Sequence, residues 1–295
     1  NKGKADKMET TALRNRVEMP LLGYGVLQMK EPRQCEKCVR AALESGYRMF
    51  DTAASYGNEE PVGRALKKYM DEGKVRREEL FVTTKPWIDD AREDSAGKAF
   101  ETSLAKLGLD YIDLYLVHQP YGDYYGAWRA MEKLYEEGRI RALGVSNFSP
   151  ERLVDLCMNS HIPPMVNQVE LHPFYHQEQA LHIMRELGVQ PQAWAPLCEG
   201  LRNIFSNKVL EKIGKKYGRS VAQTALRWNI DRQVSVVTRS SIPEHMREDF
   251  DIWDFSLSDG DRKLISGLDL GYSEILDYGN PCIARMFLSK KGHSR

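Results

Sequence analysis

The segment Tyr111–Val145, YIDLYLVHQPYGDYYGAWRAMEKLYEEGRIRALGV, decides the fold. It begins with Tyr111–His118, a largely apolar run that predicts a strand buried on both faces. The stretch Tyr125–Glu137 alternates apolar and polar residues at helical spacing, and Gly138 is suited to end that helix in a left-handed conformation. A second apolar run, Ile140–Val145, predicts the next strand. A strand, a helix and a strand in this order predict a parallel βαβ unit.

The same unit repeats on both sides of this segment. Further apolar runs predict strands at Leu21–Val26, Tyr47–Asp51, Leu80–Lys85, Met165–Glu170, Val189–Ala195 and Val234–Thr238. Helices are predicted at Arg33–Ser45, Glu59–Asp71, Asp94–Leu107, Pro150–Asn159, Gln177–Leu187 and Lys208–Tyr217. Strands that alternate with helices predict an all-parallel sheet covered by helices. Eight such strands favour closure into a (β/α)8 TIM barrel of the α/β class over an open sheet.

The remaining segments predict additions to the barrel. Thr10–Met19 alternates apolar and polar residues and predicts a hairpin that caps the barrel floor. Two extra helices are expected at Ile242–Phe250 and Ser258–Leu268, and Tyr272–Arg295 is expected to be irregular and to fold over a barrel mouth. Residues 1–7 are polar and lysine-rich, and we expect them to be a disordered or expression-derived leader. No linker or composition shift interrupts the rest, so we expect one domain over residues 1–295.

Composition points to a small-molecule partner. The 295 residues are 42% hydrophobic, and 42 basic residues balance 42 acidic ones, for a formal net charge of zero. A chain without a basic excess has no global field to hold nucleic acid or an anionic membrane. No apolar run approaches the ~18 residues that a membrane span requires. Five cysteines are a sparse and odd number, which favours a reduced protein in the cytoplasm.

Two patterns could indicate metal or redox chemistry. Cys35 and Cys38 form a Cys-x-x-Cys pair, but no second Cys or His pair follows at zinc spacing, so we interpret both as ordinary helix residues. Three histidines, His172, His176 and His182, lie close together in the sequence. A proline between the first two interrupts any helix that would align them. We therefore predict no metal site.

Four polar residues stand where predicted strands stop. Asp51, Lys85 and His118 end three consecutive strands, and Tyr56 follows Asp51 in a loop. Each has an ordinary structural explanation: a helix cap, a solvated rim charge, a buried imidazole and a loop anchor. Together they predict a site, because active sites of such barrels lie at the C-terminal ends of the strands and a buried lysine needs a partner such as Asp51.

The four side chains suit the reduction of a carbonyl group. A hydride that reaches the carbonyl carbon leaves an alkoxide that must be protonated, and Tyr56 is the candidate acid. Lys85, held by Asp51, should lower the pKa of Tyr56, and a neutral His118 should orient the carbonyl oxygen. Gly23-Tyr24-Gly25 is not followed by the third glycine of a Gly-x-Gly-x-x-Gly motif. A nicotinamide cofactor would therefore bind at the barrel mouth and not in a Rossmann domain.

An ordered series of motifs resembles the aldo-keto reductase family from about Met19 to Leu268. The series is Asp51-Thr52-Ala53 with Tyr56-Gly57-Asn58-Glu59, Thr84-Lys85-Pro86-Trp87, Leu116-Val117-His118-Gln119-Pro120, Gly144-Val145-Ser146-Asn147-Phe148 and Val166-Asn167-Gln168-Val169-Glu170. Gly23-Tyr24-Gly25-Val26 and Ala193-Trp194-Ala195-Pro196-Leu197 resemble the branch of prostaglandin F synthase and 2,5-diketo-gluconate reductase.

The resemblance implies roles for individual residues. It implies that Asp51, Tyr56, Lys85 and His118 are a catalytic tetrad, and that Trp194 stacks on the nicotinamide ring; without the family, a core aromatic at the barrel top explains Trp194 equally well. Contacts to the nicotinamide carboxamide are implied for Ser146, Asn147 and Gln168. Further cofactor contacts are expected at Gly25, Val26, Asp51, Ala195 and Leu197. The substrate pocket is expected to include Leu27, Tyr56, Trp87 and His118.

The loop after the last strand bears on the choice of cofactor. Relatives in the family clasp the 2′-phosphate of NADPH with a Lys-Ser stretch and an arginine. Here the expected cofactor contacts are Arg239, Ser240, Ser241, His245, Glu248 and Asp249. Arg239 retains a phosphate-binding fork, but His245 stands where arginine is usual and Asp249 where asparagine is usual. We predict that NADP(H) is used with reduced preference, so that NAD(H) also serves.

The sequence thus predicts an NAD(P)H-dependent reductase of small aldehydes, ketones or keto-sugars, and the resemblance favours a monomer. Two alternatives stay open. One is a cofactor-binding regulatory subunit with little turnover, and the other is a metal-dependent barrel hydrolase. Cys198, next to the predicted cofactor residues, is expected to be buried and inert, although an oxidation-sensitive thiol is the alternative.

Overall fold

A closed parallel barrel forms the centre of the molecule. The computed structural model describes residues 8–289. Eight parallel strands are hydrogen-bonded in the order β10-β3-β4-β5-β6-β7-β8-β9, and the ring closes between β9 and β10. Their bounds are β3 Leu22–Gly25, β4 Met49–Asp51, β5 Phe81–Thr84, β6 Ile112–Val117, β7 Ile140–Ser146, β8 Val166–Glu170, β9 Gln190–Trp194 and β10 Ser235–Thr238. The predicted (β/α)8 barrel is confirmed.

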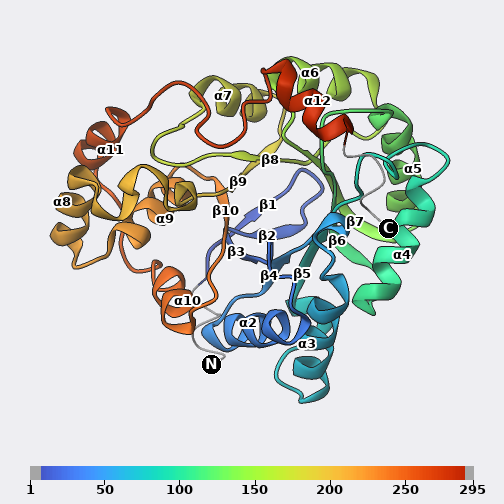
Figure 1. The fold of residues 1–295 in the computed structure, drawn as a ribbon, viewed down its shortest axis with the longest axis horizontal. Helices are drawn as coiled ribbons and strands as arrows, with labels where there is room; N and C mark the ends of the chain where they lie inside the picture. The colour runs from blue at the N-terminus through green and yellow to red at the C-terminus, as the bar shows by residue number, and fades with distance from the viewer. Residues whose placement is uncertain (1–7, 290–295) are drawn as a thin grey trace.

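Helices surround the strands, as Figure 1 shows. They are α2 Pro32–Ser45, α3 Glu59–Asp71, α4 Ala96–Leu107, α5 Tyr124–Glu136, α6 Pro150–Asn159, α7 Glu178–Glu186, α8 Lys208–Tyr217, α9 Val221–Asp231, α10 Pro243–Phe250, α11 Asp259–Ser266 and α12 Pro281–Ser289. Short 3₁₀ segments are η1 Ala54–Tyr56, η2 Arg77–Glu79 and η3 Cys198–Ser206. Caps define several ends: the Asn207 side chain accepts two backbone N–H groups at the start of α8, and Gly218 ends it at a φ of 67°.

The strands are short and packed on both faces, as the apolar runs predict. Every residue of β6 is buried, because one face fills the barrel interior and the other packs against helices. The close approach of β7 to β8 also requires a small residue in β7. A Cβ added at Gly144 would lie 2.5 Å from the carbonyl oxygen of Val166 in β8. Gly144 therefore allows these two strands to meet.

The predicted hairpin covers the N-terminal end of the barrel. β1 (Thr10–Ala12) pairs antiparallel with β2 (Glu18–Pro20). Between them, the Arg14 guanidinium donates to backbone carbonyl oxygens of Pro163 and Pro164, before β8, and of Leu187 and Gly188, before β9. The hairpin thus closes the floor, at the end opposite the expected active site.

Two segments differ from the sequence prediction. The tail was expected to be irregular, but Pro281–Ser289 forms α12, which is drawn beside α6 at the top of Figure 1. α9 was not predicted at all. Gln223, Arg227 and Asp231 recur at helical spacing and offered a signal for this helix, although its residues Ala222–Ile230 are all buried. The expected leader, residues 1–7, lies outside the described part of the chain.

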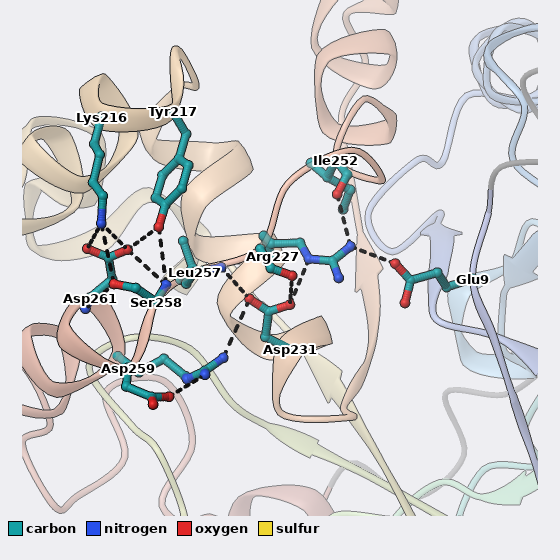
Figure 2. Close-up of polar contacts among 12 residues, drawn as sticks. Glu9, Lys216, Tyr217, Arg227, Asp231, Ile252, Leu257, Ser258, Asp259 and Asp261 are labelled. Carbon is teal, nitrogen blue, oxygen red and sulfur yellow. Dashed lines mark hydrogen bonds and ion pairs between the residues drawn. The ribbon is translucent and has the colours of Figure 1, made fainter.

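Charged contacts fix the helices that follow the barrel strands (Figure 2). The carboxylate of Asp231, at the end of α9, accepts from the Arg227 side chain at 2.8 Å and from the backbone N–H of Leu257 at 2.7 Å. Arg227 also reaches Glu9 beside the hairpin at 2.8 Å. Asp261 in α11 binds Lys216 of α8 at 3.2 Å. These contacts are far from the strand ends that carry the predicted site, and we interpret them as structural.

Candidate active site

Three adjacent strands bring the predicted catalytic residues to one mouth of the barrel. Asp51 is the last residue of β4, Lys85 directly follows β5, and His118 directly follows β6. β4 pairs with β5, and β5 pairs with β6. Tyr56 is the last residue of η1, which leaves the C-terminal end of β4. The spacing of the motifs therefore places all four side chains at the same end.

Lys85 is the centre of the cluster. Its side chain is fully buried, and Nζ donates to Asp51 Oδ1 at 2.6 Å and to the backbone oxygen of Thr52 at 3.0 Å. The third neighbour is the hydroxyl of Tyr56, at 3.4 Å from Nζ. A buried ammonium is stable only when it is paired and hydrogen-bonded, and Asp51 supplies the charge. The predicted contact between Lys85, Asp51 and Tyr56 is present.

Burial and charge act in opposite directions on these groups. Burial alone would lower the pKa of Lys85, but Asp51 and Tyr56 more than compensate, and the pKa is raised above 10.5. We expected Lys85 to lower the pKa of Tyr56. Burial, the strongest influence, instead raises that pKa above 10.0, and Lys85 only opposes the rise. Lys85 thus acts in the expected direction but does not outweigh burial, and Tyr56 carries its proton at neutral pH.

His118 is an uncharged neighbour of Tyr56. Burial, and then the charge of Lys85, hold the pKa of His118 well below 6.5. The imidazole ring meets the Tyr56 ring edge-on at a centroid distance of 5.7 Å and the Trp87 ring at 5.4 Å. Among the described residues, nothing hydrogen-bonds to its buried Nδ1. A neutral ring can donate one hydrogen bond to a substrate oxygen.

The cluster opens into a cavity of about 790 Å³, within the usual size of small-molecule sites. Most of the sequence-predicted site residues line it: Gly25, Leu27, Asp51, Tyr56, Trp87, His118, Ser146, Asn147, Gln168, Trp194, Ala195, Leu197 and Arg239. Lys85 lies behind this wall, bonded to Asp51 and Tyr56. The structure does not bring Val26, Ser240, Ser241, His245, Glu248 or Asp249 to the cavity wall. Their predicted cofactor contacts stay predictions.

Polar side chains at the end of β7 and β8 support one another beside the tetrad. Gln168 Nε2 donates to Asp51 Oδ2 at 2.8 Å, and Ser146 Oγ donates to the backbone oxygen of Gln168 at 2.8 Å. Asn147 has a left-handed φ of 64°, donates to the His118 carbonyl oxygen at 3.1 Å and accepts from Trp194 Nε1 at 2.8 Å. Asparagine tolerates this conformation better than most residues. The network orients three amide or indole groups around the cavity.

Charge at the far end of the cavity is arranged differently from the expectation. Arg239 Nη1 donates to the Leu27 carbonyl oxygen at 2.8 Å and to Gln28 Oε1 at 2.7 Å, which places the guanidinium at the cavity wall. Asp249 was expected to repel a phosphate. Its side chain is buried and accepts from Thr238 Oγ1 at 3.1 Å, and burial raises its pKa to about 7. Asp249 is therefore turned away from the cavity, and its repulsion is weaker than expected.

The tail supplies cavity residues that the sequence analysis missed. Ile275, Leu276, Tyr278 and Phe287 line the cavity on the side of Trp87. Phe287 packs on Trp87 with ring centroids 5.8 Å apart. The apolar residues of Pro281–Ser289 offered a short helical signal, but nothing in the sequence says which part of the barrel this helix covers. The expectation that the tail folds over a mouth is confirmed.

Neither pattern considered for metal chemistry forms a metal site within residues 8–289, where no group of three potential ligands is found. Cys35 and Cys38 are free thiols buried in α2. His172 is bonded to Glu170, and His176 packs on a tryptophan ring. Cys198 is buried, and burial raises its pKa to about 12, as expected of an inert thiol. No helix between residues 8 and 289 has the length and apolar character to cross a bilayer.

Comparison with known proteins agrees with the motifs. The model of the "Aldo/keto reductase family" matches residues 22–269. The glyoxal reductase of Bacillus subtilis (strain 168) is 44% identical over 262 residues, which cover 88% of this chain and 93% of that protein. The crystal structure of MGS-M4, an aldo-keto reductase enzyme from a Medee basin deep-sea metagenome library, superposes with a TM-score of 0.87 at 42% identity and covers 92% of this chain and 98% of that one.

A more distant structure contains a nicotinamide cofactor. The Bombyx mori aldo-keto reductase in complex with NADP superposes with a TM-score of 0.87 at 31% identity, over 92% of this chain and 96% of that one. The family resemblance drawn from the motifs is thus confirmed over most of the chain. The protein belongs to the aldo/keto reductase family.

Proposed function

We propose that this protein reduces small aldehydes and ketones to alcohols, with NADPH as the hydride donor and Tyr56 as the general acid. The observation that carries the proposal is the buried contact of Lys85 Nζ with Asp51 Oδ1 at 2.6 Å and with the Tyr56 hydroxyl at 3.4 Å. This contact gives a phenol at the cavity wall a fixed cation beside it. A structural lysine would need no phenol at that position.

The cavity has the features that a nicotinamide cofactor requires. Trp194 offers an aromatic face for a flat ring, and the amides of Asn147 and Gln168 lie beside it for the carboxamide. Arg239, at the far end of the cavity, can bind phosphate with its planar fork. The NADP complex of the Bombyx mori relative supports the same use of the cavity. These residues would hold the cofactor here.

The reaction divides between cofactor and protein. When bound, the reduced nicotinamide supplies a hydride to the carbonyl carbon. Neutral His118 donates a hydrogen bond to the carbonyl oxygen and positions it near Tyr56. Tyr56 then transfers its proton to that oxygen as negative charge develops there. The ammonium of Lys85 stabilises the resulting phenolate, and Asp51 keeps Lys85 charged and in place.

The choice between the two cofactors rests on Arg239 and its surroundings. His245 is exposed and stands outside the cavity wall, so Arg239 is the cation that we assign to the 2′-phosphate. Lys30 also lines the cavity, but it lacks a planar fork. Because Arg239 is the one arginine among the described residues of the cavity wall, we propose that NADPH is preferred only modestly and that NADH also serves. The ratio of kcat/KM for the two cofactors tests this point. A preference for NADPH of more than a few hundred-fold would contradict it.

The substrate class follows from the cavity and from a relative. The Bacillus subtilis protein is named a glyoxal reductase, and small dicarbonyl compounds fit the proposed reaction here as well.

We also propose that the chain acts as a monomeric single domain in the cytoplasm. Its cysteines between residues 8 and 289 are all free thiols, which suits a reducing compartment.

A panel of carbonyl compounds tests the proposed function. The protein should oxidise NADPH, followed by its absorbance, in the presence of aldehydes, α-dicarbonyls, keto-sugars or quinones. Failure with all four classes, combined with NADPH binding, would overturn the proposal in favour of a regulatory subunit. Activity that is lost with a chelator and restored by a metal would favour the hydrolase-like alternative.

A further inference from the structure

Glu170, the last residue of β8, binds the tail of the chain. Its carboxylate is buried and receives five hydrogen bonds, four of them from residues 273–276. Oε1 accepts from Ser273 Oγ at 2.6 Å, from Ile275 N at 3.3 Å and from Leu276 N at 3.1 Å. Oε2 accepts from Glu274 N at 3.1 Å. One carboxylate therefore holds three consecutive backbone amides and a hydroxyl. We call Glu170 and residues 273–276 the tail anchor.

A histidine completes the tail anchor from the barrel side. His172 is fully buried, and its Nδ1 accepts the backbone N–H of Phe174 at 3.2 Å. Nε2 therefore carries the ring proton and donates it to Glu170 Oε2 at 2.9 Å. Burial would raise the pKa of Glu170, but these donors outweigh it and the pKa is lowered below 4.5. The carboxylate is thus ionised at neutral pH and needs all of its donors.

The anchored segment leads directly to the apolar wall of the cavity. Ile275 and Leu276 line the cavity, and Tyr278 and Phe287 follow. Tyr278 stacks on Phe287 with an interplanar angle of 6°, and Phe287 contacts Trp87. The family model ends at residue 269, so this wall is built from residues beyond the matched part of the family. A wall without charged side chains favours a substrate with an apolar group.

Other contacts of the tail are weaker than the carboxylate. Tyr278 OH donates to Gln119 Oε1 at 2.7 Å. Glu274 pairs with Arg202 of η3 at 2.5 Å, but the Arg202 side chain is 43% exposed. An exposed ion pair contributes little, whereas a buried carboxylate that is removed leaves its donors unsatisfied. Glu170 is therefore the contact on which the position of the tail depends most.

We propose that Glu170 is a positioning residue that favours small carbonyl substrates with an apolar group by fixing the tail as a wall of the cavity. The inference rests on the proposed reductase function and adds the class of substrate. The hydrogen-bond partners of the Glu170 carboxylate among the described residues belong neither to the tetrad nor to the expected cofactor residues, although its backbone pairs with Trp194 across β8 and β9. Its loss should therefore change how well an apolar group binds and should not change the chemical step.

Two α-ketoaldehydes provide a matched test. Methylglyoxal and phenylglyoxal carry the same reacting group and differ in a methyl or a phenyl substituent. In Glu170→Gln, an NH2 group replaces one of the two acceptor oxygens and would face either Glu274 N or the donors of Ser273, Ile275 and Leu276, so the tail anchor should weaken. We expect kcat/KM for phenylglyoxal to fall about tenfold, through KM, because the phenyl ring loses its apolar wall. We expect kcat/KM for methylglyoxal and the Kd for NADPH to change less than about twofold.

A second buried acid serves as the control. Asp113 is fully buried near the other end of the barrel, where Arg77 binds it at 2.7 Å and Arg141 at 3.2 Å. Asp113→Asn removes a buried carboxylate without touching the tail and should leave the ratio of the two substrates unchanged. Glu170→Asp keeps the charge, so its ratio of kcat/KM for the two substrates should lie between those of the wild-type protein and Glu170→Gln. If Glu170→Gln left the ratio of kcat/KM for the two substrates unchanged, whether or not both values fell, the proposal would be overturned.

Hydrogen exchange tests the same inference without substrate. In the wild-type protein, the amides of Glu274, Ile275 and Leu276 should exchange slowly, because the buried carboxylate holds them. Exchange as fast as in an open loop would overturn the proposal even if Glu170→Gln does not fold. If the wild-type protein reduces neither ketoaldehyde although these amides are protected, the proposed function fails and the tail anchor stands. If it reduces both and the amides are unprotected, the tail anchor fails alone.

Discussion

Two buried carboxylates at the same end of the barrel do different work. Asp51, at the end of β4, binds the ammonium of Lys85 and the amide of Gln168. Glu170, at the end of β8, binds three backbone amides, a hydroxyl and an imidazole. The first carboxylate holds a charge that a reaction can use, and the second holds a segment of chain. The partners of a buried acid, more than its position in the fold, therefore indicate whether it serves catalysis or architecture.

A third carboxylate extends the comparison. Asp249 is also buried, but one hydroxyl, that of Thr238, is its hydrogen-bond donor in the described structure. Burial raises its pKa to about 7, whereas the five donors of Glu170 lower the pKa of that residue. The donors around Glu170 thus outweigh its burial, whereas the single hydroxyl beside Asp249 does not. Three substitutions test this comparison.

Removal of Lys85 should have the largest effect, because it breaks the catalytic side of the comparison. Lys85→Met leaves Tyr56 without its cation, and we expect kcat to fall about 10³-fold. It also leaves Asp51 charged and without its ion pair, which should lower the free energy of unfolding by about 3–5 kcal/mol. Steady-state kinetics and urea unfolding measure the two effects.

A double substitution separates the two consequences. Asp51→Leu added to Lys85→Met removes the unpaired charge, so the free energy of unfolding should recover while kcat stays low. If Lys85→Met retained its kcat, the ammonium would have no part in the reaction. If activity returned in the double variant, the loss would have been one of folding.

Asp249→Asn should have a smaller effect, limited to stability and dependent on pH. The folded-state pKa of Asp249 is raised from 3.8 to about 7, so the folded protein binds this proton more tightly than the unfolded chain. The stability that this group contributes is present at low pH and is lost as the pH rises toward about 7. The variant should therefore be more stable than wild type by about 4 kcal/mol at about pH 8 and no more stable at about pH 4.

Urea unfolding at the two pH values measures the difference. Thr238→Val is the matched control, because it removes the single donor and should destabilise the charged form of Asp249 further. A gain for Asp249→Asn that is larger at the acidic pH would show that the carboxyl group is charged and favourably paired, contrary to its buried position.

Arg202→Ala should have the smallest effect. Its ion pair with Glu274 connects η3 to the tail, but the Arg202 side chain is 43% exposed and such pairs contribute less than about 1 kcal/mol. The ratio of kcat/KM for phenylglyoxal and methylglyoxal should change less than about twofold. A change as large as that expected for Glu170→Gln would mean that the exposed tie, and not the buried carboxylate, positions the tail.

The sequence predicted the barrel because each strand leaves a local pattern. Apolar runs such as Ile112–Val117 are buried on both faces, and their ends differ from the expected ones by a residue or two. α9 was missed although Gln223, Arg227 and Asp231 recur at helical spacing, because its polar face is buried in contacts with other segments of the chain, as in the bond from Arg227 to Glu9. α12 has nine residues and lies beyond the repeated unit, so its position depends on tertiary contacts with Trp87 that have no local signal.

The sequence likewise predicted part of the candidate site and missed the rest. Residues at strand ends, such as Asp51, Lys85 and His118, follow from topology, because parallel strands end at one mouth. The tail anchor was not predictable. Glu170 binds mostly backbone amides, and an amide has no residue identity that a sequence could reveal. The burial of Asp249 and its hydrogen bond to Thr238 likewise depend on how the last loop packs.

The most direct test of the account is the kcat of Tyr56→Phe, measured with NADPH and a saturating α-ketoaldehyde, together with the Kd for NADPH. The account predicts a loss of kcat of about 10³-fold or more with a Kd within about twofold of wild type, since the phenyl ring keeps the shape of the cavity and removes only the proton. A variant that retains most of its kcat would contradict the account, because another group would then have to protonate the alkoxide.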